Sequence, residues 1–287
     1  MSRLPLCAIK KGGESDLIRE PVAMGYFYPE GLSNIGNLLD SFNVVPAKEK
    51  IDAFGVISPH AGYVYSGKTA YAGYSKINVK NNIIIIGPNH TGMGADYSVM
   101  DEGKYGFGDF NISINSELAD AVIKDKGSPF VPDEIAHTKE HSVEVQIPLL
   151  YNFKKDFSIV PIIVSFMRYS DVLNASAAIF NAIKRLDLLS DVLIVASSDM
   201  THYEPAESAK LKDDIAIKEI LDLNPSGLYD KVREYKISMC GFIPAAIMLN
   251  VAKMAGRTNA RLIEYTNSGE VTGDYTSVVG YSSIVVY

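Results

Sequence analysis

The sequence predicts a single α/β domain over residues 1–287, with a central mixed, largely parallel sheet and helices on both faces. Three short, mainly apolar runs support this prediction: residues 54–58, 83–86 and 192–196. The run Ile83-Ile84-Ile85-Ile86 has no polar face, which is typical of a strand buried on both sides of a covered sheet. Each run leads into a polar loop that carries a histidine, and open α/β sheets bind ligands at such strand ends.

The remaining elements follow in chain order. Residues 1–50 are expected to form an irregular, aromatic-rich lead-in and a first helix at 33–42 that packs on the domain. Ser66 is the expected cap of the next helix. A helix is expected from about Ser142 to Phe153, although Pro148 would interrupt an interior hydrogen bond. Further helices are expected at 68–77, 115–126, 171–188, 205–221, 225–235 and 244–255, a loop with a short hairpin at 92–109, and strands at 159–164, 261–266 and 278–287.

Composition excludes several classes of protein. With 287 residues and 47% hydrophobic content, the chain can bury a large core. A net charge of -7 opposes binding to a nucleic-acid backbone. No apolar run approaches the roughly 18 residues of a membrane span, and the first residues lack the apolar core of a signal peptide. We therefore expect a cytoplasmic protein in which the thiols of Cys7 and Cys240 are reduced.

Two histidines and one cysteine form the strongest candidate site. His60 and His90 both follow the end of a predicted strand, where neither has an apolar face to fill. Two imidazoles and one thiolate suit iron, zinc or copper and leave a coordination position open. Cys240 has an alternative interpretation as a small buried hydrophobe. Its place before a predicted helix favours a thiolate that is more reactive than an ordinary thiol such as Cys7.

Further polar residues could complete this site. Asp199 and His202 share one loop, where the acid could orient the histidine or merely cap a turn. His141 and Glu144 are spaced to share a helix face, as part of the site or as an internal polar pair. His137 has no special context and is expected at the surface. Ser197 and Ser198 lack the glycines of a hydrolase nucleophile elbow, and no nucleotide-binding motif is present.

Several stretches together resemble the Memo family, which is component B of the AmmeMemoRadiSam system. The matches run in family order through nearly the whole chain. They are Ala23-x-Gly25-x-Phe27-Tyr28-Pro29, Pro59-His60-Ala61-Gly62-Tyr63-x-Tyr65-Ser66-Gly67, Gly87-Pro88-Asn89-His90, Glu140-His141-Ser142-x-Glu144, Ser197-Ser198-Asp199-x-x-His202 and Cys240-Gly241-x-x-Pro244.

The resemblance implies a fold similar to that of class III extradiol ring-cleaving dioxygenases, whose non-haem iron is held by two histidines and one glutamate. By this likeness His60 and His90 would be ligands, with Cys240 where a carboxylate is expected. His202 and His141 would stand at acid–base positions, with Asp199 beside them. The metal would be iron(II), with copper or zinc as alternatives, and the protein could be isolated metal-free. The family name also suggests a functional link to a radical enzyme.

Two functions remain open on this basis. The first is a metal-dependent oxidoreductase that acts on an unidentified small molecule. The second is a non-catalytic binding module that uses the same His/Cys crevice for a small anionic, aromatic or peptide ligand. Metal content separates them, because only the first function requires an ion.

Overall fold

The central sheet has nine strands and is parallel in its middle, as expected for a mixed, largely parallel sheet. The computed structural model of the protein describes residues 17–287. Strands β2, β9, β3 and β8 are neighbours and all run parallel, whereas β12 joins β2 antiparallel. In spatial order the strands are β10 (His202–Glu204), β12 (Val278–Val286), β2 (Gly55–Ser58), β9 (Val192–Ser197), β3 (Asn82–Pro88), β8 (Ser158–Val164), β4 (Tyr97–Val99) and β7 (Val131–Pro132), with β11 (Ala260–Asn267) paired to β12.

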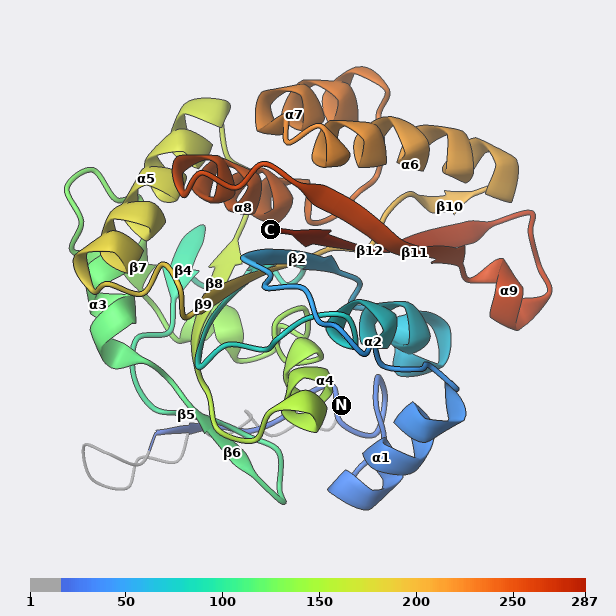
Figure 1. Cartoon of the computed structure of the whole chain (residues 1–287), viewed down its shortest axis with the longest axis horizontal. Coiled ribbons are helices and arrows are strands. Elements are labelled where there is room, and N and C mark those ends of the chain that lie inside the picture. The colour runs from blue at the N-terminus through green and yellow to red at the C-terminus, as the bar shows by residue number, and fades with distance from the viewer. Residues whose placement is uncertain (1–16) are drawn as a thin grey trace, which may run out of the picture.

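Helices cover both faces of this sheet, as Figure 1 shows. On one face lie α3 (Ser116–Ile123), α5 (Tyr169–Arg185), α6 (Ala206–Leu221), α7 (Pro225–Glu234) and α8 (Phe242–Met254). On the other face lie α1 (Leu32–Ser41), α2 (Lys68–Tyr74), which continues a π-helix at Tyr63–Gly67, and α4 (Gln146–Phe153). Two short helices, a 3-10 turn at Ile135–His137 and α9 (Gly269–Thr272), lie in connections.

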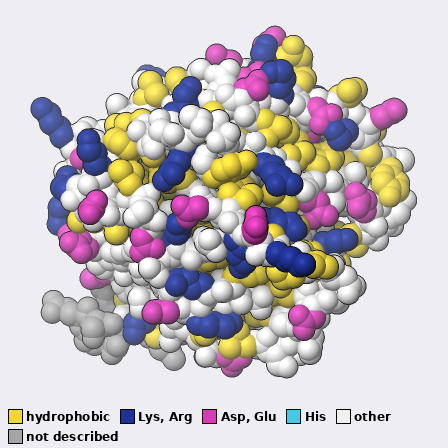
Figure 2. Space-filling model, in the orientation of Figure 1, with side chains coloured by type: hydrophobic (Ala, Val, Ile, Leu, Met, Phe, Trp, Pro, Cys, Tyr) yellow, Lys and Arg dark blue, Asp and Glu magenta, His cyan; other side chains and the backbone are white. Residues whose placement is uncertain are grey.

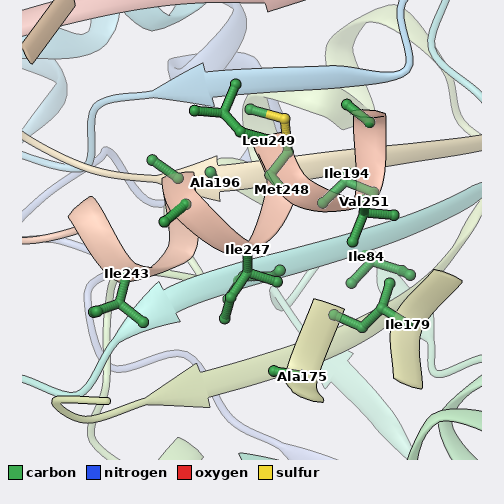
Figure 3. Packing of buried hydrophobic residues seen from close by; sticks show 14 of the residues in the cluster. Ile84, Ala175, Ile179, Ile194, Ala196, Ile243, Ile247, Met248, Leu249 and Val251 are labelled. Atoms are coloured by element: carbon green, nitrogen blue, oxygen red, sulfur yellow. The ribbon is translucent and has the colours of Figure 1, made fainter. Parts of the chain in front are cut away.

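The isoleucine run of β3 confirms the predicted burial on both sides. Ile84 and Ile86 pack in the core under α5 and α8, whereas Ile83 and Ile85 pack in the core under α2 and α4. All four side chains are fully buried. Figure 3 shows α8 lying over β9 and β3 beside α5. Each buried aliphatic side chain of this size contributes about 1.5–3 kcal/mol relative to an exposed one, so the central strands are firmly held.

Some local expectations were wrong or incomplete. Ser66 does not cap α2, because its hydroxyl donates to Ala61 O within the π-helical turn. Pro148 is tolerated because α4 begins only at Gln146, which puts the proline in the first turn, where its missing N–H costs nothing. The expected hairpin joins β5 (Lys104–Gly106) and β6 (Asn111–Ser113). It forms a separate three-stranded sheet with β1 (Ile18–Arg19) that the sequence did not predict.

The length of the helices and the charges on one face of the molecule bear on membrane spanning and nucleic-acid binding. In the described part of the chain, no helix is both long and apolar enough to cross a bilayer. Acidic and basic side chains are interspersed over the face seen in Figure 2. This mixture agrees with the negative net charge.

A buried ion pair ties the opening segment to the rest of the domain. Arg19 is paired with Glu144, and both side chains are almost fully buried. The other nitrogens of Arg19 donate to the carbonyls of His137 (2.9 Å) and Glu140 (2.7 Å). Glu144 also accepts from Tyr28 Oη at 2.6 Å. The lead-in therefore supports the segment 137–144.

We expect Arg19→Met to lower the free energy of unfolding by about 3–5 kcal/mol, because it leaves the Glu144 carboxylate buried without its counter-ion. Urea unfolding followed by circular dichroism measures the change. Lys124→Met is the matched control, since Lys124 pairs with Asp120 on an exposed helix surface, and it should cost less than about 1 kcal/mol. Equal losses in the two variants would contradict the role given to Arg19.

Candidate metal site

Two predicted ligands meet at one edge of the sheet. His60 follows β2 and His90 follows β3, and both strands run parallel to β9, which lies between them. Parallel strands end at the same edge, so their loops are brought together. The ring centroids of the two histidines lie 5.1 Å apart, with the ring planes at 77°. The expectation that His60 and His90 share one sheet edge is confirmed.

His60 is buried, and its tautomer is set by its neighbours. Its Nδ1 lies 2.9 Å from Ser197 Oγ. That hydroxyl donates to Ser142 O (2.6 Å) and accepts from Gln146 Nε2 (2.8 Å), so it has no further proton to give. His60 Nδ1 must therefore be the donor, which leaves the lone pair of Nε2 free. Burial lowers the pKa of His60 well below its ordinary value, and the nearby His90 and His141 lower it further.

A single buried carboxylate, that of Glu140, organises His90. Glu140 Oε1 lies 2.9 Å from His90 Nδ1, and Oε2 accepts from His90 N at 2.6 Å. The backbone N–H groups of His141 and Ser142 also donate to Oε1. Burial alone would raise the pKa of Glu140, but these hydrogen bonds and the His90 charge lower it to about 2. Glu140 also raises the pKa of His90, and in the neutral form of this histidine it holds Nδ1 as the donor and leaves Nε2 free.

His141 completes a group of three histidines. The ligand nitrogens of His60, His90 and His141 all lie within 4.8 Å of one another. The His141 ring packs on Phe27 (4.4 Å between centroids) and stacks on His90 (4.8 Å, 23° between planes). The lead-in thereby contributes a wall of the site. Sequence analysis assigned His141 an acid–base role, and the structure places it beside the two predicted ligands.

Cys240 reaches the same place from the opposite side of the sheet edge. Its Sγ lies 3.2 Å from His60 Nε2 and accepts from Asp199 N at 3.2 Å. Burial raises the pKa of the Cys240 thiol well above its ordinary value, and the Asp199 carboxylate raises it further. The expectation of an unusually reactive thiolate is therefore wrong for these surroundings, because desolvation outweighs the nearby start of α8. Cys7 lies outside the described residues.

Asp199 and His202 lie at the polar margin of the site and do not bond to each other. Asp199 Oδ1 accepts from the backbone N–H groups of His60 (2.8 Å) and Ala61 (3.3 Å), so it ties two strand-end loops together. Burial raises the pKa of Asp199 despite these hydrogen bonds. His202 begins β10, and its Nδ1 lies 2.9 Å from Ser238 O, which can only accept. Its Nε2 is therefore left as an acceptor.

Two residues proved to be structural rather than exposed or site-facing. Glu144 does not share a helix face with His141, because residues 141–145 form turns and its carboxylate points to Arg19. His137 was expected at the surface but is fully buried. Its Nδ1 accepts from Tyr105 Oη (3.0 Å), and its Nε2 donates to Ser98 Oγ (3.0 Å), whose own proton goes to Asp133 O.

The donor set fits a transition-metal ion. Two imidazoles with fixed tautomers present free Nε2 atoms to one point, and a third imidazole and a thiol lie beside them. Imidazole and thiol donors suit iron, copper and zinc better than magnesium or calcium. A carboxylate that accepts the other N–H of a ligating histidine, as Glu140 does for His90, is the usual support in metal sites.

Comparisons with known proteins identify the family of this chain over nearly its whole length. The family profile described as Memo-like protein matches residues 19–285. The chain belongs to the Memo family. It is 40% identical over 274 residues to a MEMO1 family protein of Aquifex aeolicus, with 93% of this chain and 98% of the relative covered. A MEMO1 family protein of Methanosarcina acetivorans is 39% identical over 276 residues, covering 94% and 99%.

A solved structure extends the likeness at the level of the fold. The uncharacterized protein JW3007 from Escherichia coli K12 matches with a TM-score of 0.54 at 11% identity, covering 81% of this chain and 99% of that protein. At so low an identity the match concerns the α/β architecture alone. Glu140, the supporting residue that sequence reasoning did not assign, stands within the Memo motif Glu140-His141-Ser142, directly before a candidate histidine. That adjacency was the available signal.

We expect His137→Gln to flatten the dependence of this Memo-family chain's stability on pH. Burial lowers the pKa of folded His137 to about 3, whereas an unfolded histidine titrates near about 6.5. Between these values the unfolded chain binds one more proton, so stability falls as the pH falls through about 6.5. The difference between wild type and variant should reach about 2 kcal/mol from pH 6.5 to pH 5. Urea unfolding at a series of pH values tests this, and parallel curves would contradict it.

Proposed function

We propose that this Memo-family protein is a metal-dependent oxidoreductase that binds iron(II), or else copper or zinc, through His60, His90 and Cys240. One observation supports the proposal above the others. The free Nε2 atoms of two histidines face a common point, and the Cys240 Sγ lies 3.2 Å from one of them. A bound ion would replace the contact between His60 Nε2 and the Cys240 thiol and use both atoms as ligands.

The Memo motif and the 3.2 Å contact of Cys240 Sγ with His60 Nε2 favour Cys240 over His141 as the third ligand. The ring of His60 crosses those of His90 and His141 at 77° and 88°. His90 and His141 are stacked on each other with 23° between their planes. We therefore keep His141 as an acid–base group next to the ion.

The remaining polar groups would handle protons. His202 offers Nε2 as a proton acceptor, since its Nδ1 donates to Ser238 O. Asp199 is held by His60 N and Ala61 N and lies beside the thiol. Three protein donors leave a coordination position open for a substrate, and an iron or copper ion there would supply Lewis acidity and electron transfer.

The likeness to class III extradiol dioxygenases belongs to this proposal, as does a small-molecule substrate in the cytoplasm. Cys240 stands where those enzymes would have a carboxylate. A thiol ligand is softer and more easily oxidised than a carboxylate. Ring cleavage is therefore not assigned, and the reaction class stays at oxidation or reduction of a small molecule. The link to a radical enzyme is part of the same proposal.

Anaerobic calorimetric titration with iron(II), copper(I) and zinc tests the metal site. We expect wild type to bind at least one ion with a dissociation constant at or below micromolar. His60→Ala and Cys240→Ala should each weaken binding by more than about 100-fold, because each removes a direct ligand. His202→Ala and His141→Ala should weaken it by less than about tenfold, at most the cost of disturbing a neighbouring group.

The variants also decide between alternatives. Loss of binding in His141→Ala with retention in Cys240→Ala would replace the proposed ligand set by the three histidines. If wild type binds none of the ions at micromolar concentration, the oxidoreductase proposal fails. The non-catalytic binding module, with the same crevice holding an anionic, aromatic or peptide ligand, would then take its place.

Glu140 gives a second, indirect test. Glu140→Gln keeps the shape of the side chain but removes the charge that orients and polarises His90. We expect metal affinity to fall by about 10–100-fold, the usual effect of changing such a supporting group. Glu134→Gln, at the start of the 3-10 turn Ile135–His137, is the control and should leave the affinity unchanged. Unaltered affinity in Glu140→Gln would mean that His90 is not a ligand.

A further inference from the structure

A separate cavity opens beside the proposed ligands. It has a volume of about 250 Å³, and His90 and Cys240 line its inner end. Its other walls are largely apolar and include Val164 at the end of β8, Phe166 in the following loop, and Phe242 and Ile243 in the first turn of α8. Asp199 and His202 do not line the cavity, and Cys240 connects it to them, because its Sγ accepts from Asp199 N.

Few polar atoms in the cavity wall are left to form hydrogen bonds with a ligand. The side chain of Asn89 makes its hydrogen bonds within its own loop. Its Nδ2 donates to Met93 O, and its Oδ1 accepts from Thr91 Oγ1 and Gly92 N. Ser165 is the exception, because its hydroxyl makes no hydrogen bond with residues 17–287. A wall of this composition favours an apolar group and penalises a charged one.

The size of the cavity restricts the occupant. An apolar cavity of about 150 Å³ holds benzene, whereas sites for drug-sized ligands run from about 300 Å³ upward. A volume of about 250 Å³ is therefore ample for one ring or a branched aliphatic group and lies below the range of drug-sized sites. Phe166 is 59% exposed at the rim, although it is a large apolar side chain. A ligand group lying in the cavity would cover part of that ring.

We propose that this cavity holds the apolar tail of the substrate, a small molecule with a polar head at His60, His90 and Cys240 and a single ring or a branched alkyl group as its tail. For its head group the inference rests on the proposed function. For its tail it rests on the cavity alone. It defines the substrate class by shape: a metal-binding head next to a single ring or a branched alkyl group, rather than a sugar, a nucleotide or an extended peptide.

Two hydroxamates test the tail in the metal-loaded protein. Acetohydroxamate and benzohydroxamate share the same metal-chelating head, and only the second carries a ring. We expect benzohydroxamate to bind zinc-loaded or iron(II)-loaded wild type at least about tenfold more tightly, as partial removal of a ring from water predicts. Calorimetry under anaerobic conditions gives both dissociation constants, and their ratio removes the contribution of the head.

Three variants test whether the cavity causes the difference in affinity between the two hydroxamates. Ser165→Phe should fill the cavity and bring the ratio close to one. Phe166→Ala removes a rim contact and should lower the ratio about threefold, the loss expected for part of a contact surface. Leu211→Ala is the matched control, because Leu211 is similarly exposed on α6 and does not line the cavity. It should preserve the wild-type ratio.

A metal-free arm separates this inference from the proposed function. Fluorobenzene has no chelating head, and its binding can be followed by fluorine NMR in the absence of added metal. We expect it to bind wild type at millimolar concentration and to lose binding in Ser165→Phe. If fluorobenzene binds wild type and not Ser165→Phe, but acetohydroxamate never binds, the proposed metal site is wrong and the apolar binding cavity is supported. If acetohydroxamate binds but the ratio is one in wild type, the metal site stands and the tail cavity is overturned.

Discussion

The parallel register of β2, β9 and β3 determines where the candidate site can form. Ser58 pairs with Ser197, and Ile86 pairs with Ala196, so the three strands finish at one edge. The loops that follow carry His60, His90 and Asp199. The register also puts Ser197, the last residue of β9, directly under the His60 ring, where it accepts the Nδ1 proton. Because all three strands are fully buried, a shift of one residue would bury the wrong side chains. Core packing thus fixes the spacing of the histidines.

The second determinant lies outside the sheet, in the segment 137–144. The Glu140 carboxylate accepts hydrogen bonds from N–H groups of His90, His141 and Ser142, and these bonds stabilise its charge in a buried position. That arrangement requires the segment to stay in place, although residues 141–145 have no regular helix to stiffen them. The lead-in supplies the missing support through Arg19, which binds the carbonyls at both ends of the turn and the Glu144 carboxylate. A buried ion pair is a weak source of net stability, but it has few alternative arrangements. Its contribution here is the position of the loop.

Sequence reasoning succeeded where apolar runs define the structure and failed where distant contacts do. The run Ile83–Ile86 predicted a strand buried on both sides, and the strand-end position of His60 and His90 predicted their meeting. The pairing of β1 with the β5–β6 hairpin escaped prediction because β1 is only two residues long and its partner Lys104 is far away in the sequence. His137 looked unremarkable because its partners, Tyr105 and Ser98, are more than thirty positions away. Cys240 was misjudged in its pKa because a helix start is visible in sequence, whereas desolvation is not.

The crevice has two walls of opposite character, and this difference constrains how any ligand can lie. Asp199 and His202 form the polar wall, where buried charge and a free imidazole nitrogen favour groups that exchange protons. Phe166, Phe242 and Ile243 form the apolar wall, where a charged group would lose its hydration without compensation. A molecule that spans both must therefore direct its polar atoms toward β10 and its apolar atoms toward α8. The candidate donors between the walls are positioned independently of either one, His60 through Ser197 and His90 through Glu140. Changes in a wall can thus alter which molecule fits while the donors keep their geometry.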